Sequence, residues 1–449
     1  MATNQHVVMV PWLAFGHPIP FFQLSLQLAR AGFKVSFVST PGNTKRLPKV
    51  PANVATLLEL VPFPLPGLDN EQLLPPGCEA TVDIPSEDVQ YLKIAYDLLR
   101  HPVKQFVMDQ KPDWIWADVI PYWVVEIAEE LHVPLAIFSV FSAASSCFFV
   151  IPTVLTGGDG RKKSPESLTS APEWFDFPSP LAYPRFLATG VHEGFYGVNA
   201  SGISDDERLA KIIQASKAVA FRTCPEYEAE YLNLFEKKSS KEEQAMISSG
   251  GSMFKRLTRL CSLGFGSECK LSKEQVQEIA YGVELSGLPF LWALREPDWA
   301  ASEVDTLPCG FIERTQGRGV VCFGWAPQSE ILGHPSIGGS LFHSGWGSII
   351  ETLQFGHSLV VLPLVIDQPL TARLLVHKGL AVEIERSEDG SFSRDDIAKA
   401  LRLAMVSEQG EKLRSRAREA AQVFGNRDLQ DTYFNTFVKY LKENGASNQ

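Results

Sequence analysis

Strand-like and helix-like patterns alternate along the first half of the chain. Residues 6–13 (HVVMVPWL) are almost wholly apolar, residues 18–31 repeat apolar positions at helical spacing, and residues 34–40 are again strand-like. Apolar strands separated by helices predict a parallel sheet that helices cover on both faces. Three later runs are predicted to add strands to the same sheet, at 113–119, 134–141 and 218–224.

A polar stretch interrupts this alternation near the middle of the chain. Residues 236–251 (EKKSSKEEQAMISSGG) are charged and rich in Ser, which is typical of a linker. We therefore expect an N-terminal domain over 1–235, a linker over 236–255 and a C-terminal domain over 256–427. Residues 428–449 are predicted to form a last helix, which could return to the N-terminal domain.

The alternation of strands and helices resumes after the linker. Strands are predicted at 289–294, 319–324, 337–342 and 358–362, and helices at 273–286, 328–332, 345–354, 369–378, 394–405, 410–424 and 428–443. The fold class that follows is α/β, with two Rossmann-like, doubly wound domains.

One charge-free run is long enough for a membrane span. Residues 133–158 contain no Asp, Glu, Lys or Arg before Asp159, and about 20 apolar residues can cross a bilayer. Prolines and serines interrupt the run, however, and its first part (VPLAIFSVF) is typical of a buried strand. We expect a core strand that leads into a pocket wall.

Composition and charge indicate how many domains the chain has, which partners it could bind and in which compartment it is found. The 449 residues exceed the size at which a single hydrophobic core stops growing, about 250 to 300 residues. The formal net charge of −11 argues against a nucleic-acid partner, because contacts with phosphates require clustered Lys and Arg. Seven cysteines without metal-site spacing favour a reducing compartment, and no signal-peptide pattern opens the chain. A cytoplasmic monomer without a metal or a transmembrane segment is expected.

Two polar residues follow predicted strands of the first domain. His17 lies after the first strand and directly before a helix, and Asp118 ends the strand at 113–119. Ligands of open α/β sheets lie beyond the carboxyl ends of the strands, so Asp118 could reach the imidazole and support it as a general base. The alternatives are a helix-start histidine and a loop-capping aspartate, and the pair alone is a weak signal.

A more specific signal lies in the second domain. Trp325 to Gln328 (WAPQ) follow a strand, and residues 343–348 (HSGWGS) join a strand to a helix, with Glu351 one turn later. Gly345 and Gly347 allow close backbone approach, and the free N–H groups at a helix start attract phosphate oxygens. A flat Trp face and a ribose-binding carboxylate complete the pattern expected of a nucleotide-diphosphate site.

The stretch from Trp325 to Gln368, WAPQSEILGHPSIGGSLFHSGWGSIIETLQFGHSLVVLPLVIDQ, resembles the donor-binding signature of plant UDP-dependent glycosyltransferases. Similar stretches elsewhere, GHPIPFFQLSLQLARAGFKVSFVST, PDWIWADVIPYW and GFGSECKLSKEQVQEIAYGVELSGLPFLWALR, extend the resemblance over most of the chain. This family has two Rossmann-like domains in the GT-B arrangement. The resemblance implies a UDP-sugar as co-substrate and no prosthetic group.

The resemblance also implies roles for individual residues. His17 would deprotonate the acceptor hydroxyl with the support of Asp118. On the donor side, Trp325 would stack on uracil, and Ala326 and Gln328 would meet uracil or ribose. The remaining residues would hold the ribose, the diphosphate and the sugar, namely Glu351 for the ribose, Ser267, His343 and Ser348 for the diphosphate, Trp346 beside phosphates and sugar, and Asp367 and Gln368 for the sugar. Taken singly, the two tryptophans could be core aromatics, His343 a strand-end histidine and residues 264–267 an ordinary turn.

Two positions depart from the family pattern. Gly347 stands where the family usually has Asn, and the loss of that donor is expected to weaken donor binding by about 1 to 3 kcal/mol. Residues 252–263 (SMFKRLTRLCSL) stand where the apolar first strand of the second domain is expected, but they are basic and poorly patterned. The second sheet is therefore at risk of losing a central strand.

The acceptor is expected to be a small apolar metabolite such as a flavonoid or terpenoid. Phe15, Tyr122, Trp123 and Phe141 lie near strand ends of the first domain and could line an aromatic pocket, although they could equally be core residues. The N-terminal sequence resembles a branch of this family whose members often add glucose or rhamnose to a sugar that the acceptor already carries. Two other functions are considered, a non-catalytic binder impaired at Gly347 and at 252–263, and a dehydrogenase, which the absence of a GxGxxG motif disfavours.

Overall fold

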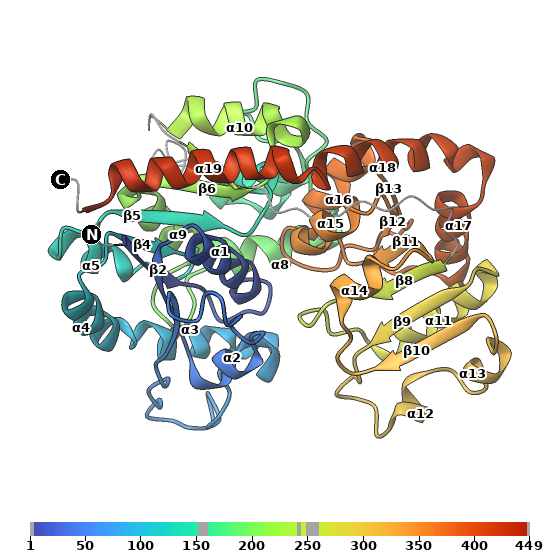
Figure 1. Ribbon diagram of the computed structural model, residues 1–449. Helices are drawn as coiled ribbons and strands as arrows, with labels where there is room; N and C mark the ends of the chain where they lie inside the picture. Colours follow the sequence, from blue (N-terminus) through green and yellow to red (C-terminus); the bar gives the residue numbers. More distant parts are fainter. Residues whose placement is uncertain (1–3, 151–159, 240–243, 248–259, 447–449) are drawn as a thin grey trace. The chain divides into compact units, whose positions relative to one another are not determined.

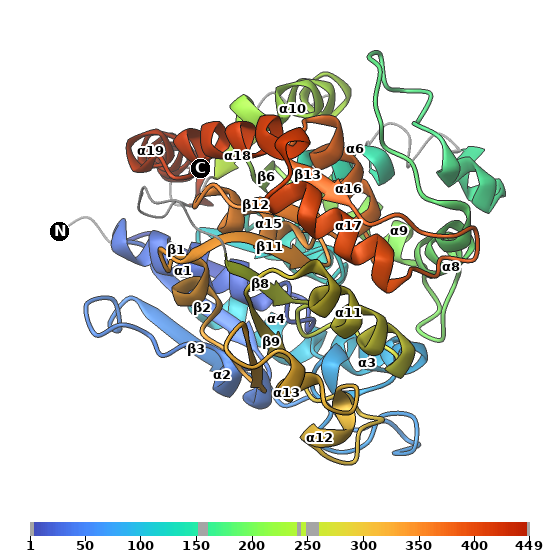
Figure 2. The same cartoon turned by 90° about the vertical axis from the view of Figure 1, so that its right-hand side faces the viewer.

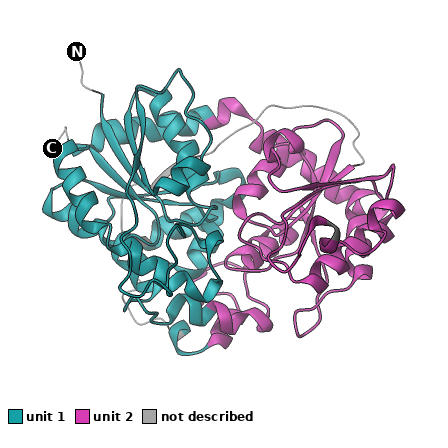
Figure 3. Ribbon diagram, turned by 90° about the horizontal axis from the view of Figure 1, so that it is seen from below, with its two compact units in different colours: residues 1–164, 192–248, 431–449 teal, residues 165–191, 249–430 magenta. Residues whose placement is uncertain are grey.

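The computed structural model describes residues 4–150, 160–239, 244–247 and 260–446. The chain forms two compact units, each built around one parallel sheet (Figures 1 and 3). Unit 1 comprises residues 1–164, 192–248 and 431–449, and unit 2 comprises residues 165–191 and 249–430. The prediction of two parallel α/β folds is confirmed.

The sheet of unit 1 has seven strands in the order β3-β2-β1-β4-β5-β6-β7. Every pairing is parallel, and Met9 lies opposite both Phe37 and Trp116. The order of strands reverses between β1 and β4, which is where open α/β sheets bind ligands. The strands are β1 His6–Val10, β2 Lys34–Ser39, β3 Leu58–Pro62, β4 Trp114–Ala117, β5 Leu135–Ser139, β6 Ala218–Arg222 and β7 Gln244–Ile247.

Apolar faces of helices cover this sheet. Phe21 and Leu28 of the first helix and Phe437 of the last helix share one buried cluster with Trp116. The indole N–H of Trp114 donates to the carbonyl of Leu441 at 3.0 Å, so the last helix is fixed to the sheet of unit 1. The helices are α1 Pro18–Arg30, α2 Pro41–Arg46, α3 Val89–Asp97, α4 Arg100–Gln110, α5 Val124–Glu130, α6 Ala143–Phe149, α9 Asp205–Ala215 and α10 Pro225–Ser239. Two more, α8 Arg185–Tyr196 and α19 Arg427–Asn444, begin in unit 2 and end in unit 1.

The sheet of unit 2 has six parallel strands in the order β10-β9-β8-β11-β12-β13. The order reverses between β8 and β11, so this sheet also has a switch point near its centre. The strands are β8 Leu260–Gly264, β9 Phe290–Leu294, β10 Gly319–Phe323, β11 Ile337–Phe342, β12 Ser358–Val361 and β13 Ala381–Glu383.

The helices of unit 2 carry clear start and stop signals. α11 begins after Ser272, which forms a capping box with Gln275, and it ends at Gly287, whose φ is +72°. Its buried face packs against α17 and the sheet, and the two helices lie side by side in both views (Figures 1 and 2). The helices are α11 Lys273–Ser286, α12 Glu303–Thr306, α13 Phe311–Arg314, α14 Gln328–Leu332, α15 Trp346–Leu353, α16 Gln368–His377, α17 Arg394–Met405 and α18 Glu411–Phe424.

The structure corrects two expectations about the middle of the chain. Residues 244–247 form the edge strand β7 inside the stretch expected to be only a linker, because backbone pairing with β6 does not depend on polar composition. The basic residues 252–263 suggested that the second sheet could lack a central strand, but this strand is present as β8, between β9 and β11. Cys261 and Leu263 of β8 are buried, whereas residues 252–259 lie outside the described residues.

The charge-free run forms β5 and α6 rather than one long helix. Ser142 ends the intervening turn and caps α6 by accepting from the N–H of Ser145 at 3.0 Å. Among the described residues, none of the helices is long and apolar enough to cross a bilayer. Residues 151–158 of this run lie outside the described part.

Candidate functional site

His17 and Asp118 meet at the carboxyl edge of the sheet of unit 1. His17 directly precedes α1, and Asp118 directly follows β4, the neighbour of β1. The imidazole Nδ1 lies 2.8 Å from the carboxylate Oδ2, as the sequence suggested. Both side chains are buried, with residue exposures of 8% for His17 and 0% for Asp118.

Backbone groups fix the Asp118 carboxylate in this position. Oδ2 also accepts the N–H of Trp12 at 2.8 Å, and Oδ1 accepts the N–H of Val119 at 2.7 Å. An ionised carboxylate only accepts hydrogen bonds, so the contact places the imidazole proton on Nδ1. The lone pair of the neutral ring is then on Nε2, the atom that a general base requires.

The four aromatic residues proposed for an acceptor pocket differ in their surroundings. Phe141 contacts His17 edge-on with 5.6 Å between ring centroids, and Phe15 lies beneath the guanidinium of Arg46 at 5.8 Å. Tyr122 is partly buried, whereas Trp123 is only 2% exposed, so Trp123 matches the core alternative.

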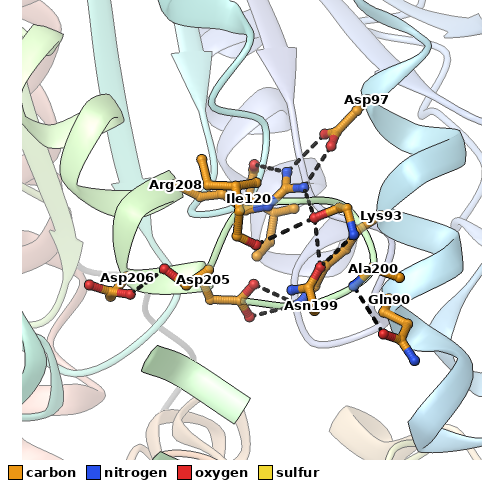
Figure 4. Close-up of polar contacts among 12 residues, drawn as sticks. Gln90, Lys93, Asp97, Ile120, Asn199, Ala200, Asp205, Asp206 and Arg208 are labelled. Atoms are coloured by element: carbon orange, nitrogen blue, oxygen red, sulfur yellow. Dashed lines mark hydrogen bonds and ion pairs between the residues drawn. The ribbon is translucent and has the colours of Figure 1, made fainter. Parts of the chain in front are cut away.

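An ionic network that the sequence did not reveal surrounds the buried side chain of Arg208 (Figure 4). The guanidinium of Arg208 donates to both oxygens of Asp97, at 2.8 and 2.6 Å, and to the carbonyl of Ile120 at 3.2 Å. It also lies over the Tyr122 ring at 4.8 Å. Burial outweighs the adjacent cation and raises the pKa of Asp97. These residues are far apart in the sequence and form no motif, so sequence reasoning had no signal for them.

In unit 2, the turn from β11 to α15 combines glycines with a partly buried histidine. Burial lowers the pKa of His343 to about 4, so its imidazole is neutral near pH 7. A Cβ at Gly266 would lie 2.9 Å from His343 Cε1, and one at Gly345 would lie 2.5 Å from Nε2. Both positions therefore need glycine beside this ring. Ser344 has a left-handed backbone, with φ of +62°.

Polar side chains line the start of α15. The amide Nε2 of Gln328 donates to Glu351 at 2.9 Å and lies 3.4 Å from the hydroxyl of Ser348. Trp325 is 81% exposed, which rules out the core alternative for this indole, and Ala326 follows it in the same loop. Trp346, in contrast, is only 3% exposed.

The loop between β12 and α16 carries the last two predicted donor residues. Asp367 and Gln368 are 8% and 6% exposed. The Gln368 Oε1 accepts the N–H groups of Leu364 and Val365 at 2.9 and 3.0 Å, which fixes the amide. The hydroxyl of Ser344 donates to the carbonyl of Gln368 at 2.9 Å, so this loop is connected to the turn before α15.

The structure therefore gathers the predicted donor residues beyond the carboxyl ends of four strands of unit 2. Ser267 follows β8, and Trp325 follows β10. His343, Gly347, Ser348 and Glu351 follow β11, whereas Asp367 and Gln368 follow β12. The arrangement offers a flat exposed ring, a helix start and several hydrogen-bonding groups, as a nucleotide ligand would require.

The chain is similar to known proteins over nearly its whole length. Residues 235–412 match the family model described as UDP-glucoronosyl and UDP-glucosyl transferase. UDP-glycosyltransferase 91C1 of Arabidopsis thaliana is 38% identical over 98% of this chain and 97% of its own. The soyasaponin III rhamnosyltransferase of Glycine max is 36% identical over 98% of this chain and 95% of its own.

A solved structure shows the same fold. The UDP-glucose: anthocyanidin 3-O-glucosyltransferase in complex with UDP superposes with a TM-score of 0.77. The match covers 99% of this chain and 100% of that one, with 22% sequence identity. At this identity, the likeness supports the fold rather than a substrate.

Proposed function

The chain belongs to the family of plant UDP-dependent glycosyltransferases, and from this premise we propose that it transfers glucose or rhamnose from a UDP-sugar to a hydroxyl of a small plant metabolite. The observation that carries the proposal is the 2.8 Å contact between His17 and Asp118 at the sheet edge of unit 1. A non-catalytic binder has no need of a base held in one tautomer. The similarity to named transferases likewise favours the enzyme over the binder.

His17 acts as the base in the proposed reaction. Its Nε2 takes the proton of the acceptor hydroxyl while that oxygen forms a bond to the anomeric carbon of the donor. The bond between this carbon and the diphosphate oxygen breaks, and UDP leaves with the electron pair. Asp118 stabilises the imidazolium, and a single displacement inverts the anomeric carbon.

Unit 2 supplies the groups that would hold the donor. The Trp325 ring stacks on uracil near Ala326, and the Gln328–Glu351 pair meets the ribose. The start of α15 stabilises the charge that develops on the diphosphate, together with Ser267, His343 and Ser348. Asp367 and Gln368 bind sugar hydroxyls, with Gln368 offering its amide N–H, since its oxygen already accepts two backbone N–H groups.

The acceptor is proposed to be an apolar ring system, such as a flavonoid or terpenoid, that already carries a sugar. The name of the soyasaponin III rhamnosyltransferase, a relative over nearly the whole chain, supports a saponin as acceptor. Phe141 beside His17 is the best-placed of the proposed aromatic residues to contact the ring system. We place acceptor binding in residues 1–235, apart from residues 165–191, which belong to unit 2, and donor binding in residues 256–427.

The cytosol is the proposed compartment, and a monomer the proposed state. None of the seven cysteines, all of which lie in the described part of the chain, forms a disulfide, which fits a reducing environment.

Product analysis tests the proposed function. Purified protein is incubated with UDP-glucose or UDP-rhamnose and with a matched pair of acceptors, an aglycone and its monoglycoside. The expected result is a mass increase of one sugar on the monoglycoside. UDP-sugar binding in a thermal-shift assay without any product would instead support the non-catalytic binder.

A further inference from the structure

A strained backbone position directly precedes the two proposed sugar-binding residues. Ile366 has φ of +51°, in the left-handed region that β-branched residues rarely adopt because Cβ approaches the following carbonyl. Its side chain is 57% exposed, so tight packing of that side chain does not explain the conformation. Strain of this kind persists only where the surrounding structure fixes the backbone.

One hydrogen bond from a distant segment restrains this position. The hydroxyl of Tyr183 donates to the carbonyl of Ile366 at 2.6 Å, across 183 residues of sequence. Tyr183 is 2% exposed, and its N–H donates to the carbonyl of Leu168 at 2.9 Å, so the phenol is held in place. Both Tyr183 and Ile366 belong to unit 2.

The same loop is connected to the phosphate-binding turn. The hydroxyl of Ser344 donates to the carbonyl of Gln368 at 2.9 Å, and the hydroxyl of Thr371 donates to the carbonyl of Ser344 at 2.8 Å. These bonds fix the part of the loop that follows Asp367. In the part of the loop before Asp367, Gln368 Oε1 accepts from the N–H groups of Leu364 and Val365, and Tyr183 holds the carbonyl of the strained residue itself.

We propose that Tyr183 is a positioning residue for the donor sugar. Its hydroxyl holds Ile366 in the left-handed conformation, and that conformation places Asp367 and Gln368 for the sugar hydroxyls. Without the hydroxyl, Ile366 relaxes toward negative φ and both side chains move away from the sugar. This inference rests on the proposed function and adds to it a residue outside the donor signature.

Tyr183→Phe tests the inference, because it removes only the hydroxyl. We expect the KM for the UDP-sugar to rise about three- to tenfold, as the loss of one hydrogen bond implies, while the Kd for UDP stays within twofold. UDP lacks the sugar that the loop binds. Tyr433→Phe is the matched control, since Tyr433 donates to Glu226 in unit 1 at 2.7 Å, and it is expected to leave both constants unchanged.

A second substitution tests the role of strain. Glycine adopts positive φ without penalty, so Tyr183→Phe/Ile366→Gly is expected to return the KM to within about twofold of the parent value. A parent-like KM for Tyr183→Phe, a parallel rise in the Kd for UDP, or a further rise in KM in the double variant would each overturn the proposal. An unsubstituted protein that transfers no sugar would instead overturn the proposed function itself.

Discussion

The imidazole of His17 and the carboxylate of Asp118 lie 2.8 Å apart, although 101 residues separate them in the sequence. Parallel pairing of β1 and β4 brings them together, because their carboxyl ends reach the same sheet edge. Two backbone N–H groups, from Trp12 and Val119, also donate to the carboxylate. The acid is thus fixed before any substrate arrives, and it determines which imidazole nitrogen carries the proton.

Removal of the imidazole is expected to slow the chemical step while donor binding continues. His17→Ala should lower kcat about a hundred- to ten-thousandfold, the usual contribution of a general base. The Kd for UDP, which depends on unit 2, should stay unchanged when measured by calorimetry. A variant with undiminished kcat would exclude His17 as the base.

Asp118→Asn removes the negative charge and one acceptor oxygen while it keeps the size of the side chain. The amide has only one acceptor oxygen, so it cannot accept from His17, Trp12 and Val119 together as the carboxylate does; the imidazole then loses its preferred tautomer, and the imidazolium loses its stabilising charge. We expect kcat to fall about a hundredfold or more with little change in either KM. A kcat within threefold of the parent enzyme would show that the 2.8 Å contact is not needed for the reaction.

Trp325→Ala is expected to act on nucleotide binding alone. Stacking of a base on an aromatic ring contributes about 1 to 3 kcal/mol, so the Kd for UDP should rise about five- to 150-fold. Because the indole is 81% exposed, the melting temperature should change little. Val320→Ala, at another exposed position of the same region, is the control and should bind UDP normally. Equal affinities in the two variants would remove Trp325 from the donor site.

Most longer elements of unit 2 could be predicted to within one or two residues, whereas the short β13, α12 and α13 were not predicted. Apolar runs and capping signals identify α11 at 273–286 and β11 at 337–342 with the bounds that the structure shows. β8 and β7 could not be predicted in this way. β8 is short and follows a basic stretch, and β7 lies in a polar segment, so both depend on pairing with neighbouring strands rather than on local pattern.

The site could be predicted only where the sequence carries a local signature. The 325–368 segment is contiguous and has a characteristic spacing, whereas the partners of Arg208 and Tyr183 come from distant segments. The left-handed backbone of Ile366 had no signal either, because left-handed positions are inferred from Gly or Asn. Tertiary contacts, which no local pattern encodes, determine these features.

Buried neutral histidines make the stability of the fold dependent on pH. Burial lowers the pKa of His6 and that of His357 to about 4, from a value of about 6.5 in the unfolded chain. Between pH 6.5 and 4, the unfolded state binds more protons, so the free energy of unfolding falls as the pH falls through this window. Each histidine can contribute up to about 3 kcal/mol to this loss.

His357→Gln tests this dependence on pH. Urea unfolding at pH 7.5, 6 and 5 should show a smaller loss of stability on acidification for the variant than for the parent protein. The glutamine can still accept from or donate to Ser340, the 3.1 Å partner of the His357 Nδ1. Identical pH dependences of parent and variant would show that His357 is not buried in its neutral form.

Gly347 offers a gain-of-function test at the start of α15. The family usually has Asn at this position, so Gly347→Asn should supply a donor to a diphosphate oxygen and lower the Kd for UDP about five- to 150-fold, the equivalent of 1 to 3 kcal/mol. Replacing a glycine in the first turn of a helix also stabilises the helix, by at most about 0.5 to 1 kcal/mol for Ala and by less for Asn, and Gly347→Ala reproduces that effect without adding a donor. We therefore expect both variants to melt higher than the parent protein and only Gly347→Asn to bind UDP more tightly. Equal gains in affinity for the two variants would trace the effect to helix stability, and no gain in either would show that the phosphate lies away from Gly347.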